Sequence, residues 1–401
     1  MSQFPAHDGE LVVGGVPLTR LAARVGSTPF YAYDRQLLKA RVAALKAALP
    51  TAVKLHYAIK ANPMPALVGH MAGLVDGLDV ASGGELTVAL DSGMSPHDIS
   101  FAGPGKRVEE LRQAVAAGVL INVESPAEIE ALATIAGDTG WTPRIALRVN
   151  PDFELKSSGM RMGGGPKQFG IDAEQIPEVI ARAESLDLVI EGFHLFAGSQ
   201  NLQAESIIEA QRKCFDLACQ LSKHASHPIR SLNLGGGLGI PYFPGNEPVD
   251  LAPIGANLAQ IADEATTVFP EAELCIELGR YLVGEAGIYV CRVLDRKVSR
   301  GQVFLVTDGG LHHHLSASGN FGQVIRKNYP VAIGNRMGAT ELEAANVVGP
   351  LCTPLDILGD RMMLPVAQVG DLVVVYQSGA YGATASPQRF LGHPAVTEVL
   401  V

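Results

Sequence analysis

The stretch Val53-Lys-Leu-His-Tyr-Ala-Ile-Lys60, followed by Ala-Asn-Pro63, decides the fold class of this 401-residue chain. The run is apolar enough for a buried strand, and a helix cannot readily continue into the residue before Pro63. In a doubly wound sheet a glycine-rich dinucleotide fingerprint would follow the first strand, but Lys-Ala-Asn-Pro stands there instead. The stretch therefore favours a barrel of parallel strands.

Strand-like apolar runs alternate with helix-like stretches from Asp34 to Gly279. We predict eight strands, over 53–60, 77–82, 99–103, 120–124, 144–150, 190–197, 231–236 and 273–279. The predicted helices cover 65–75, 84–92, 108–117, 126–135, 173–185, 204–223 and 253–269. This βα alternation is typical of a parallel sheet and predicts an α/β chain with a (β/α)8 barrel.

After about Gly284 the sequence changes to strand-like runs that are separated by Gly and Pro residues. Strands are expected at 287–294, 302–307, 346–348 and 371–376, and the strand-like segment 10–17 is expected to join them. We predict a barrel domain over 28–279 and a smaller β-domain formed by 1–27 plus 280–401.

The composition excludes several classes of protein. Hydrophobic residues make up 47% and charged residues 18%, as in a globular chain, and the net charge of −10 argues against a nucleic-acid surface. The N-terminus has no signal-peptide pattern and no apolar run is long enough for a bilayer, so a cytoplasmic protein without a membrane partner is expected. The five cysteines form neither a CxxC pair nor a disulfide framework.

Lys60 is the residue of the opening stretch that suggests chemistry. A lysine at the mouth of an apolar barrel can lose its proton, because burial disfavours the ammonium, and a neutral amine forms a Schiff base with an aldehyde. The alternative is a strand-end lysine whose charged tip lies in water. Only the rest of the chain decides between the two.

Polar residues gather where the predicted strands end, which is where barrel enzymes place their working residues. They are Lys60, Asp79, Ser82, Arg148, Asn150, His194, Phe196, Glu277 and Arg280. Each alone could be a solvated rim residue. The triplet Gly235-Gly-Gly237 follows the seventh strand, where barrels often bind phosphate, although a tight turn would also explain it.

Six motifs in order carry a family resemblance: HYAIKANP (56–63), GLDVASGGEL (77–86), GSQNL (198–202), NLGGGLGIPYF (233–243), IELGRYLVGEAG (276–287) and SGAYGATAS (378–386). From about residue 25 onward the chain resembles the fold-type III pyridoxal-phosphate decarboxylases, the diaminopimelate and ornithine decarboxylase family. The resemblance implies an alanine-racemase-like barrel followed by a C-terminal β-domain. It also implies pyridoxal 5'-phosphate as cofactor and a homodimer with shared active sites.

The resemblance assigns roles by position. Lys60 resembles the Schiff-base lysine, and Glu277 resembles the carboxylate that pairs with the pyridine nitrogen. The other cofactor contacts that it implies are Asp79, Arg148, Phe196, Ser199, Gly235, Gly236, Gly237, Arg280 and Tyr381. Arg280 and Tyr381 are also expected near the substrate. Cys352, in GPLCTPLD, resembles the cysteine that crosses the dimer interface and helps to return a proton.

Three departures from the family bear on the substrate. Phe196 stands where the family usually has a histidine stacked on the ring, and whether His194 compensates stays open. Thr353 stands where Glu or Asp commonly receives a distal ammonium, with Asp356 as a substitute only if the loop geometry differs. The segment 311–318, Leu-His-His-His-Leu-Ser-Ala-Ser, lacks the Arg-Pro-x-Leu-Tyr pattern of diaminopimelate recognition.

The triple histidine has two interpretations. Strand alternation would put His312 and His314 on one face, as metal ligands require. Because no acidic or cysteine ligands accompany them, we expect no metal and a place for His312 in the substrate pocket.

These observations predict an amino-acid α-decarboxylase whose altered loops resemble those of exosortase- or carrier-protein-associated members. Its partner is then a small amino-acid substrate, or an acyl-carrier protein that presents it. Diaminopimelate decarboxylase of lysine biosynthesis is the nearest alternative. A racemase is disfavoured because racemases of this fold usually place arginine where Glu277 stands, and a non-catalytic pyridoxal-phosphate-binding protein is disfavoured by the motifs of Cys352 and Tyr381.

Overall fold

The computed structural model describes the chain except residues 2, 154–159, 162, 244, 322 and 324–325. It divides into two compact units. The barrel unit comprises Arg41–Ile240 and Glu247–Tyr281, and the β unit comprises Met1–Ala40, Pro241–Asn246 and Leu282–Val401.

The barrel unit is built on eight parallel strands, which confirms the predicted (β/α)8 barrel. They are β5 (Val53–Ala58), β6 (Gly77–Val80), β7 (Ile99–Phe101), β8 (Leu120–Val123), β9 (Arg144–Asn150), β12 (Ile190–Leu195), β14 (Ser231–Asn233) and β15 (Glu273–Leu278). Each pairs with its neighbour in the barrel, and the β8–β9 and β15–β5 pairings complete the circle. Three short strands accompany them: β11 (Ile171–Asp172) on β9, and β10 (Met160–Arg161) paired with β13 (Gly198–Ser199).

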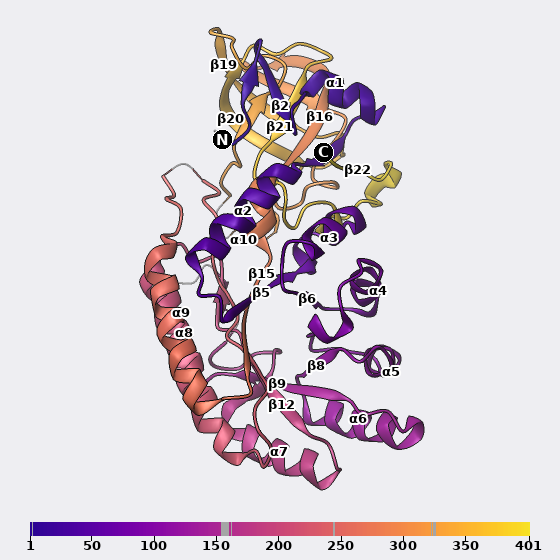
Figure 1. Cartoon of the computed structure of the whole chain (residues 1–401). Helices are drawn as coiled ribbons and strands as arrows, with labels where there is room; N and C mark the ends of the chain where they lie inside the picture. The colour runs from indigo at the N-terminus through magenta and orange to yellow at the C-terminus, as the bar shows by residue number, and fades with distance from the viewer. Residues whose placement is uncertain (2, 154–159, 162, 244, 322, 324–325) are drawn as a thin grey trace. The chain divides into compact units, whose positions relative to one another are not determined.

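Helices follow the strands and lie outside them (Figure 1). They are α3 (Pro65–Ala72), α4 (Gly83–Asp91), α5 (Val108–Ala117), α6 (Pro126–Thr139), α7 (Ile176–Ser185), α8 (Ala204–Leu221) and α9 (Leu251–Val268). Ser82 and Ser125 cap α4 and α6 by accepting hydrogen bonds from the backbone N–H groups of Glu85 and Glu128. Such caps stabilise a helix start within one or two residues of the strand end.

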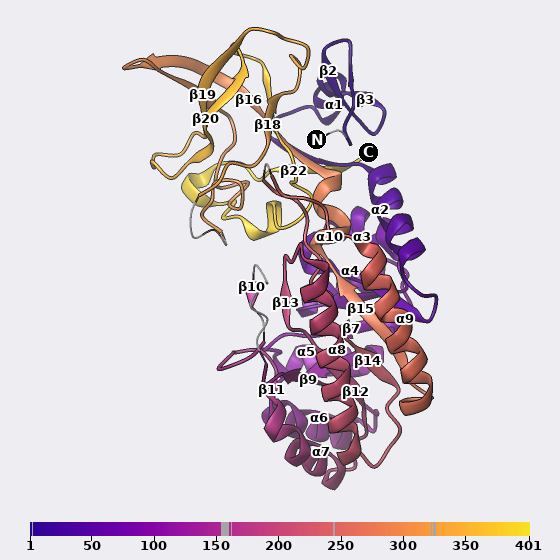
Figure 2. The same ribbon diagram turned by 90° about the vertical axis from the view of Figure 1, so that its left-hand side faces the viewer.

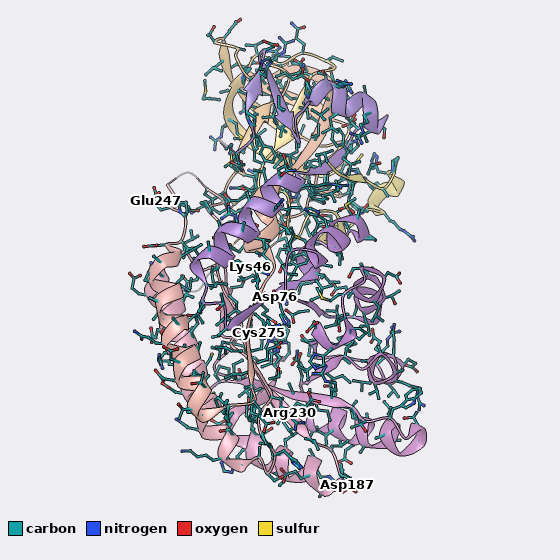
Figure 3. All side chains as sticks on the ribbon, viewed as in Figure 1. Lys46, Asp76, Asp187, Arg230, Glu247 and Cys275 are labelled. Atoms are coloured by element: carbon teal, nitrogen blue, oxygen red, sulfur yellow. The ribbon has the colours of Figure 1, made fainter. Side chains whose placement is uncertain are left out.

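An ion pair ties the preceding helix α2 (Arg35–Ala48) to the barrel. Lys46 Nζ lies 2.8 Å from Asp76 Oδ1, and the two side chains point toward each other in Figure 3. Asp76 Oδ2 accepts from the backbone N–H of Leu55 in β5 at 2.9 Å. Although partial burial opposes it, these bonds hold the pKa of Asp76 below its usual value.

The β unit contains a sheet in the order β18-β21-β16-β17-β19-β20, to which β4 and β22 add (Figure 2). Its strands are β4 (Phe30–Tyr33), β16 (Gly287–Ser299), β17 (Gln302–Thr307), β18 (Val331–Ile333), β19 (Leu342–Val348), β20 (Ile357–Pro365), β21 (Leu372–Val375) and β22 (Thr397–Leu400). A small sheet of β1 (Ala6–His7), β2 (Glu10–Val13) and β3 (Val16–Pro17) precedes helix α1 (Leu18–Val25), and α10 (Arg280–Val283) follows β15. Residues of β2, α1, β4, β16 and β21 share one apolar core. The separate β-sheet domain is thereby confirmed.

The compact units differ slightly from the predicted domain limits. Strand β4 groups with the β unit because it pairs with β16 along Phe30–Tyr33. Whether the ranges 28–279 and 1–27 plus 280–401 fold as domains stays a prediction.

Two predicted local structures are wrong. Lys60 is not in a strand, because β5 ends at Ala58 and a 3-10 turn, Ile59–Ala61, follows. The segment of His312 is not a strand either, because the N–H groups of His313 and His314 both donate to the carbonyl of Gly310 and form a turn. Among the described helices none is long and apolar enough to cross a membrane.

Candidate active site

Each of the eight barrel strands contributes at least one buried polar side chain. One from each strand belongs to what we call the polar belt, and β9 has a second, Asn150, that we leave out of it. The belt residues are His56, Asp79, Ser100, Asn122, Arg148, His194, Asn233 and Glu277. Four neighbouring pairs are level in the strand register, and the other four are displaced by two residues. Four steps of two residues amount to the shear of eight that is typical of this barrel, so the belt follows its stagger all the way round.

On one side of the belt, hydrogen bonds join four adjacent strands. His56 Nδ1 lies 3.2 Å from Asp79 Oδ1, the same oxygen accepts from Ser100 Oγ, and Asn122 Nδ2 donates to Ser100 Oγ at 3.3 Å. Burial lowers the pKa of His56, but the charge and hydrogen bond of Asp79 outweigh it and the net pKa is raised. Asp79 Oδ2 is buried with no partner among the described residues.

On the other side the belt surrounds Glu277. Glu277 Oε2 lies 3.2 Å from His194 Nε2 and accepts from Asn233 Nδ2 at 3.3 Å. Burial raises the pKa of Glu277, but His194, Lys60 and Arg148 lower it far more, so the net pKa lies well below the usual value. A buried carboxylate is therefore kept ionised inside the barrel.

Lys60 lies beyond the end of β5. Its side chain is exposed, because the 3-10 turn carries it out of the strand, so its predicted desolvation is wrong for this chain by itself. Its Nζ lies 5.8 Å from the centre of the Phe196 ring. Burial raises the pKa of Glu85, and the nearby charge of Lys60 offsets part of this rise. Lys60 and Phe196 thus lie together at the strand ends.

The glycine triplet after β14 has no room for side chains. A Cβ at Gly235 would lie 2.8 Å from the Leu195 carbonyl oxygen, and one at Gly236 would lie 2.0 Å from the Glu277 carbonyl oxygen. Gly235 and Gly237 also have φ values of +67° and +86°, which favour glycine. No described residue accepts from the N–H groups of Gly236 and Gly237. Such a backbone loop is suited to the oxygens of a phosphate.

Buried ion pairs hold Arg148 at the belt. Arg148 Nη1 donates to Glu124 Oε1 at 2.8 Å, while Glu124 Oε2 accepts from the N–H of Gly170 at 3.1 Å. Behind them Lys106 Nζ lies 3.0 Å from Glu128 Oε2, which also accepts from the N–H of Glu124. Burial opposes ionisation of Glu124, but Arg148 and Lys106 lower its net pKa.

Besides His312, four predicted site residues belong to the β unit. Cys352 is exposed, and Thr353 Oγ1 accepts from the N–H of Leu355 at 3.3 Å. Tyr381 is half-buried with φ +53°, and its carbonyl accepts from Ser316 Oγ at 2.9 Å. Asp356 is buried.

The carboxylate of Asp356 serves two loops. Its Oδ1 accepts from the N–H of Leu311 at 2.6 Å, and its Oδ2 accepts from that of Leu351 at 2.9 Å. Burial raises its pKa despite these bonds. These contacts favour a structural role for Asp356. They do not support the predicted contact with substrate, which stays a prediction.

The three adjacent histidines are buried in the β unit. His313 Nε2 lies 2.8 Å from the Pro394 carbonyl oxygen, and His314 Nε2 lies 2.9 Å from Ser378 Oγ. The His312 ring lies 3.8 Å from that of His313, and its nitrogens have no hydrogen-bond partner among the described residues. Burial lowers the pKa of both His312 and His314 to about 3, so these rings are neutral. The described residues include no group of three or more His, Cys, Asp or Glu that could hold a metal.

The barrel unit therefore brings Asp79, Arg148 and Glu277 into one belt, beside the glycine triplet. Ser199 lies in β13, and Arg280 begins α10 directly after β15. His194 is buried beside Glu277, so it does not take the place of Phe196. Sequence reasoning missed His56, Ser100, Asn122 and Asn233, although each is a polar residue in one of the predicted strands.

The chain is similar to known proteins in sequence and in fold. Residues 35–284 match the family described as pyridoxal-dependent decarboxylase, pyridoxal binding domain. The chain is 39% identical over 389 residues to the L-glutamyl-[BtrI acyl-carrier protein] decarboxylase of Niallia circulans, which covers 96% of this chain and 90% of that protein. It is 35% identical over 400 residues to the diaminopimelate decarboxylase of Aquifex aeolicus, covering 98% and 91%. A crystal structure of M. jannaschii diaminopimelate decarboxylase with L-lysine matches with a TM-score of 0.89 at 26% identity, covering 99% of this chain and 92% of that one.

Proposed function

The chain belongs to the pyridoxal-dependent decarboxylases, and from this membership we propose roles for its residues and a class of substrate. It is a carboxy-lyase that uses pyridoxal 5'-phosphate and removes carbon dioxide from an amino acid or an aminoacyl group. We further infer that the far end of its substrate is neutral, acidic or joined to an acyl-carrier protein.

The residues of the barrel unit fit this cofactor. The N–H groups of Gly236 and Gly237 are available to phosphate oxygens, and Ser199 and Arg280 would be further phosphate contacts. Tyr381 of the β unit, assigned to the phosphate by position in the family, remains part of the proposal. Asp79 and Arg148 would surround the ring, and Phe196 would pack against its face, since an aromatic ring can stack without donating a proton.

The residue assignments rest mainly on one observation, the buried and ionised carboxylate of Glu277. A carboxylate held ionised inside the barrel can keep a proton on a pyridine nitrogen. When bound, pyridoxal phosphate supplies the electron sink for the electron pair that carbon dioxide leaves behind. Lys60 would hold the cofactor through its amine, which can bond to an aldehyde. Cys352, supplied by the second chain of a homodimer, returns a proton to the α-carbon.

Thr353 and the His312 segment support the substrate class. A threonine hydroxyl cannot neutralise a distal ammonium, and an unpaired charge in a partly buried pocket is costly. His312 would line the pocket as a neutral ring. The 39% identity to a carrier-protein decarboxylase, against 35% to a diaminopimelate decarboxylase, also favours a carrier-linked substrate. The homodimer and a cytoplasmic location remain part of the proposal.

A substrate panel tests this proposal. Carbon dioxide release is measured with meso-diaminopimelate, lysine, ornithine, glutamate and a glutamyl group on an acyl-carrier protein. We expect kcat/KM for the basic amino acids to be roughly a hundredfold lower than for the best neutral, acidic or carrier-linked substrate. Efficient turnover of diaminopimelate would instead assign the chain to lysine biosynthesis.

A further inference from the structure

Asn233 connects two parts of the site that would meet opposite ends of the cofactor. Its Nδ2 donates to Glu277 Oε2 at 3.3 Å, and its Oδ1 accepts from the N–H of Gly235 at 2.7 Å. The side chain is only 5% exposed, so neither bond is shared with bulk water. A backbone bond from the N–H of Glu277 to the Gly235 carbonyl, at 2.9 Å, lies beside it.

The two contacts of Glu277 fall on the same oxygen. His194 and Asn233 both approach Oε2, and no described residue hydrogen-bonds to Oε1. His194 is 1% exposed and level with Asn233 in the strand register, so both approach from neighbouring strands. The carboxylate is held by one oxygen and can accept from a ligand with the other.

We propose that Asn233 is a positioning residue that couples the phosphate-binding glycine loop to Glu277. This rests on the proposed roles of the loop and of Glu277. The primary amide is the side chain that suits this position, because it donates to a carboxylate with one end and accepts from an N–H group with the other. An ionised carboxylate of similar shape can make only the bond to the N–H group, and an alkyl side chain can make neither.

The charged and titratable groups around Glu277 come from several elements. They are His194 on β12, Arg148 on β9, His56 on β5, Lys60 after β5 and Cys275 on β15 itself, which Figure 3 labels inside the barrel. Three of them, His194, Lys60 and Arg148, lower the pKa of Glu277. A change at Asn233 leaves all of these groups in place, so its effect can be separated from theirs.

Asn233→Asp separates the two bonds. It keeps an acceptor for the N–H of Gly235, but it removes the donor to Glu277 and places a second carboxyl beside it. Two adjacent carboxyls titrate as a pair, and the charge of one raises the pH at which the pair takes up its first proton, so the doubly ionised pair is lost at higher pH as the solution is acidified. We expect the acid limb of kcat to move upward by about one pH unit or more. The affinity for pyridoxal phosphate at pH 8 should stay within about threefold, because the loop bond remains.

Asn233→Leu removes both bonds at similar volume. We expect it to weaken the affinity of the apoprotein for pyridoxal phosphate about tenfold, since the N–H of Gly235 is left without its acceptor. Affinity is measured by fluorescence titration, and protonation of Glu277 is followed through its carboxyl infrared band in the apoprotein. Neither readout depends on turnover.

Asn335→Asp is the matched control. In the β unit, Asn335 Nδ2 donates to Asp371 Oδ1 at 2.8 Å, and its Oδ1 accepts from the N–H of Leu372 at 2.9 Å. The same substitution there should leave both the acid limb and the cofactor affinity unchanged. An equal shift in the control would show a general effect of the new charge and overturn the proposal.

His194→Leu is the positive control for the pH readout. Because His194 lowers the pKa of Glu277, its loss should also move the acid limb upward, and His194→Gln should restore only the smaller part that the hydrogen bond supplies. An unshifted acid limb in Asn233→Asp, or an unchanged affinity for pyridoxal phosphate in Asn233→Leu, would overturn the inference. Failure of the wild-type protein to bind pyridoxal phosphate would overturn the assigned roles instead.

Discussion

Glu277 and Asp356 are both buried carboxyls, but their surroundings give them opposite properties. Glu277 contacts His194 and lies near the charges of Lys60 and Arg148, so its net pKa is lowered although burial opposes this. Asp356 accepts mainly from backbone N–H groups, and burial raises its pKa. The first can act as a permanent charge toward a ligand, whereas the second holds its loops together.

At the residue scale, the first prediction concerns Lys60. Lys60→Ala should abolish turnover and the near-visible absorbance of the holoenzyme, because that absorbance requires conjugation between the lysine nitrogen and the cofactor ring. Borohydride reduction followed by peptide mapping should label Lys60 in the wild type. The matched control is Lys54→Ala, on strand β5 just before Lys60, whose Nζ lies 3.6 Å from Glu273 Oε2 at the surface. A label on another lysine would refute the assignment.

Thr353 carries the second prediction at this scale. Thr353→Glu should raise kcat/KM for lysine and ornithine by roughly tenfold or more relative to glutamate-type substrates, because it offers a charge to the distal ammonium. The comparison is made on both proteins with the same substrate panel. Unchanged ratios would mean that residue 353 does not meet the far end of the substrate.

At the scale of elements, apolar runs were enough to predict all eight barrel strands. Their ends were less accurate, since the predicted runs continued through Ala197 and Gly236 where the structure has loops. The chain remains apolar there because these loops are themselves packed. The turn at His312 was missed because it depends on the carbonyl of Gly310, which accepts from two N–H groups and leaves no mark in the side-chain pattern.

The polar belt shows what a sequence leaves undetermined. Asn122 and Asn233 can be recognised as polar residues in apolar strands. Which of them meet depends on the stagger between strands, and no single strand contains that information. The glycine triplet was predictable for the opposite reason, since its function depends on local backbone freedom.

The loop ends of β8 and β9 give a prediction at the element scale. Glu124→Gln should lower the free energy of unfolding by about 3 kcal/mol at pH 7, because it leaves Arg148 buried without its charge partner. Glu130→Gln on α6 is the control. Its ion pair with Arg182 is about half exposed, so its loss should change stability little. Urea unfolding measures both, and equal effects would contradict the role of burial.

At the scale of the whole molecule, the chain divides into two units that share the predicted machinery. Lys60 belongs to the barrel unit and Cys352 to the β unit. If the active sites of the homodimer combine residues from two chains, the variants Lys60→Ala and Cys352→Ala should complement each other. Equal mixing leaves one complete site in each hybrid dimer, so roughly a quarter of the wild-type activity should return.

The mixed sample must be compared with each variant alone after proven subunit exchange. Activity no higher than that of the variants would mean that both residues serve a site within one chain, or that Cys352 is dispensable.

The two hydrogen bonds that Asp356 accepts limit how the substrate preference of a relative can be introduced by exchanging loops. Asp356 binds the backbone beside His312 and beside Cys352 at once, and Cβ atoms at Gly310 and Gly349 would each come within 2.3 Å of its oxygens. If segment 311–318 is replaced by that of a relative, its backbone would no longer match the position of the Asp356 carboxylate. Segments 311–318 and 349–356 must therefore be exchanged together. Chimeras should retain a folded pocket only when both segments come from the same parent.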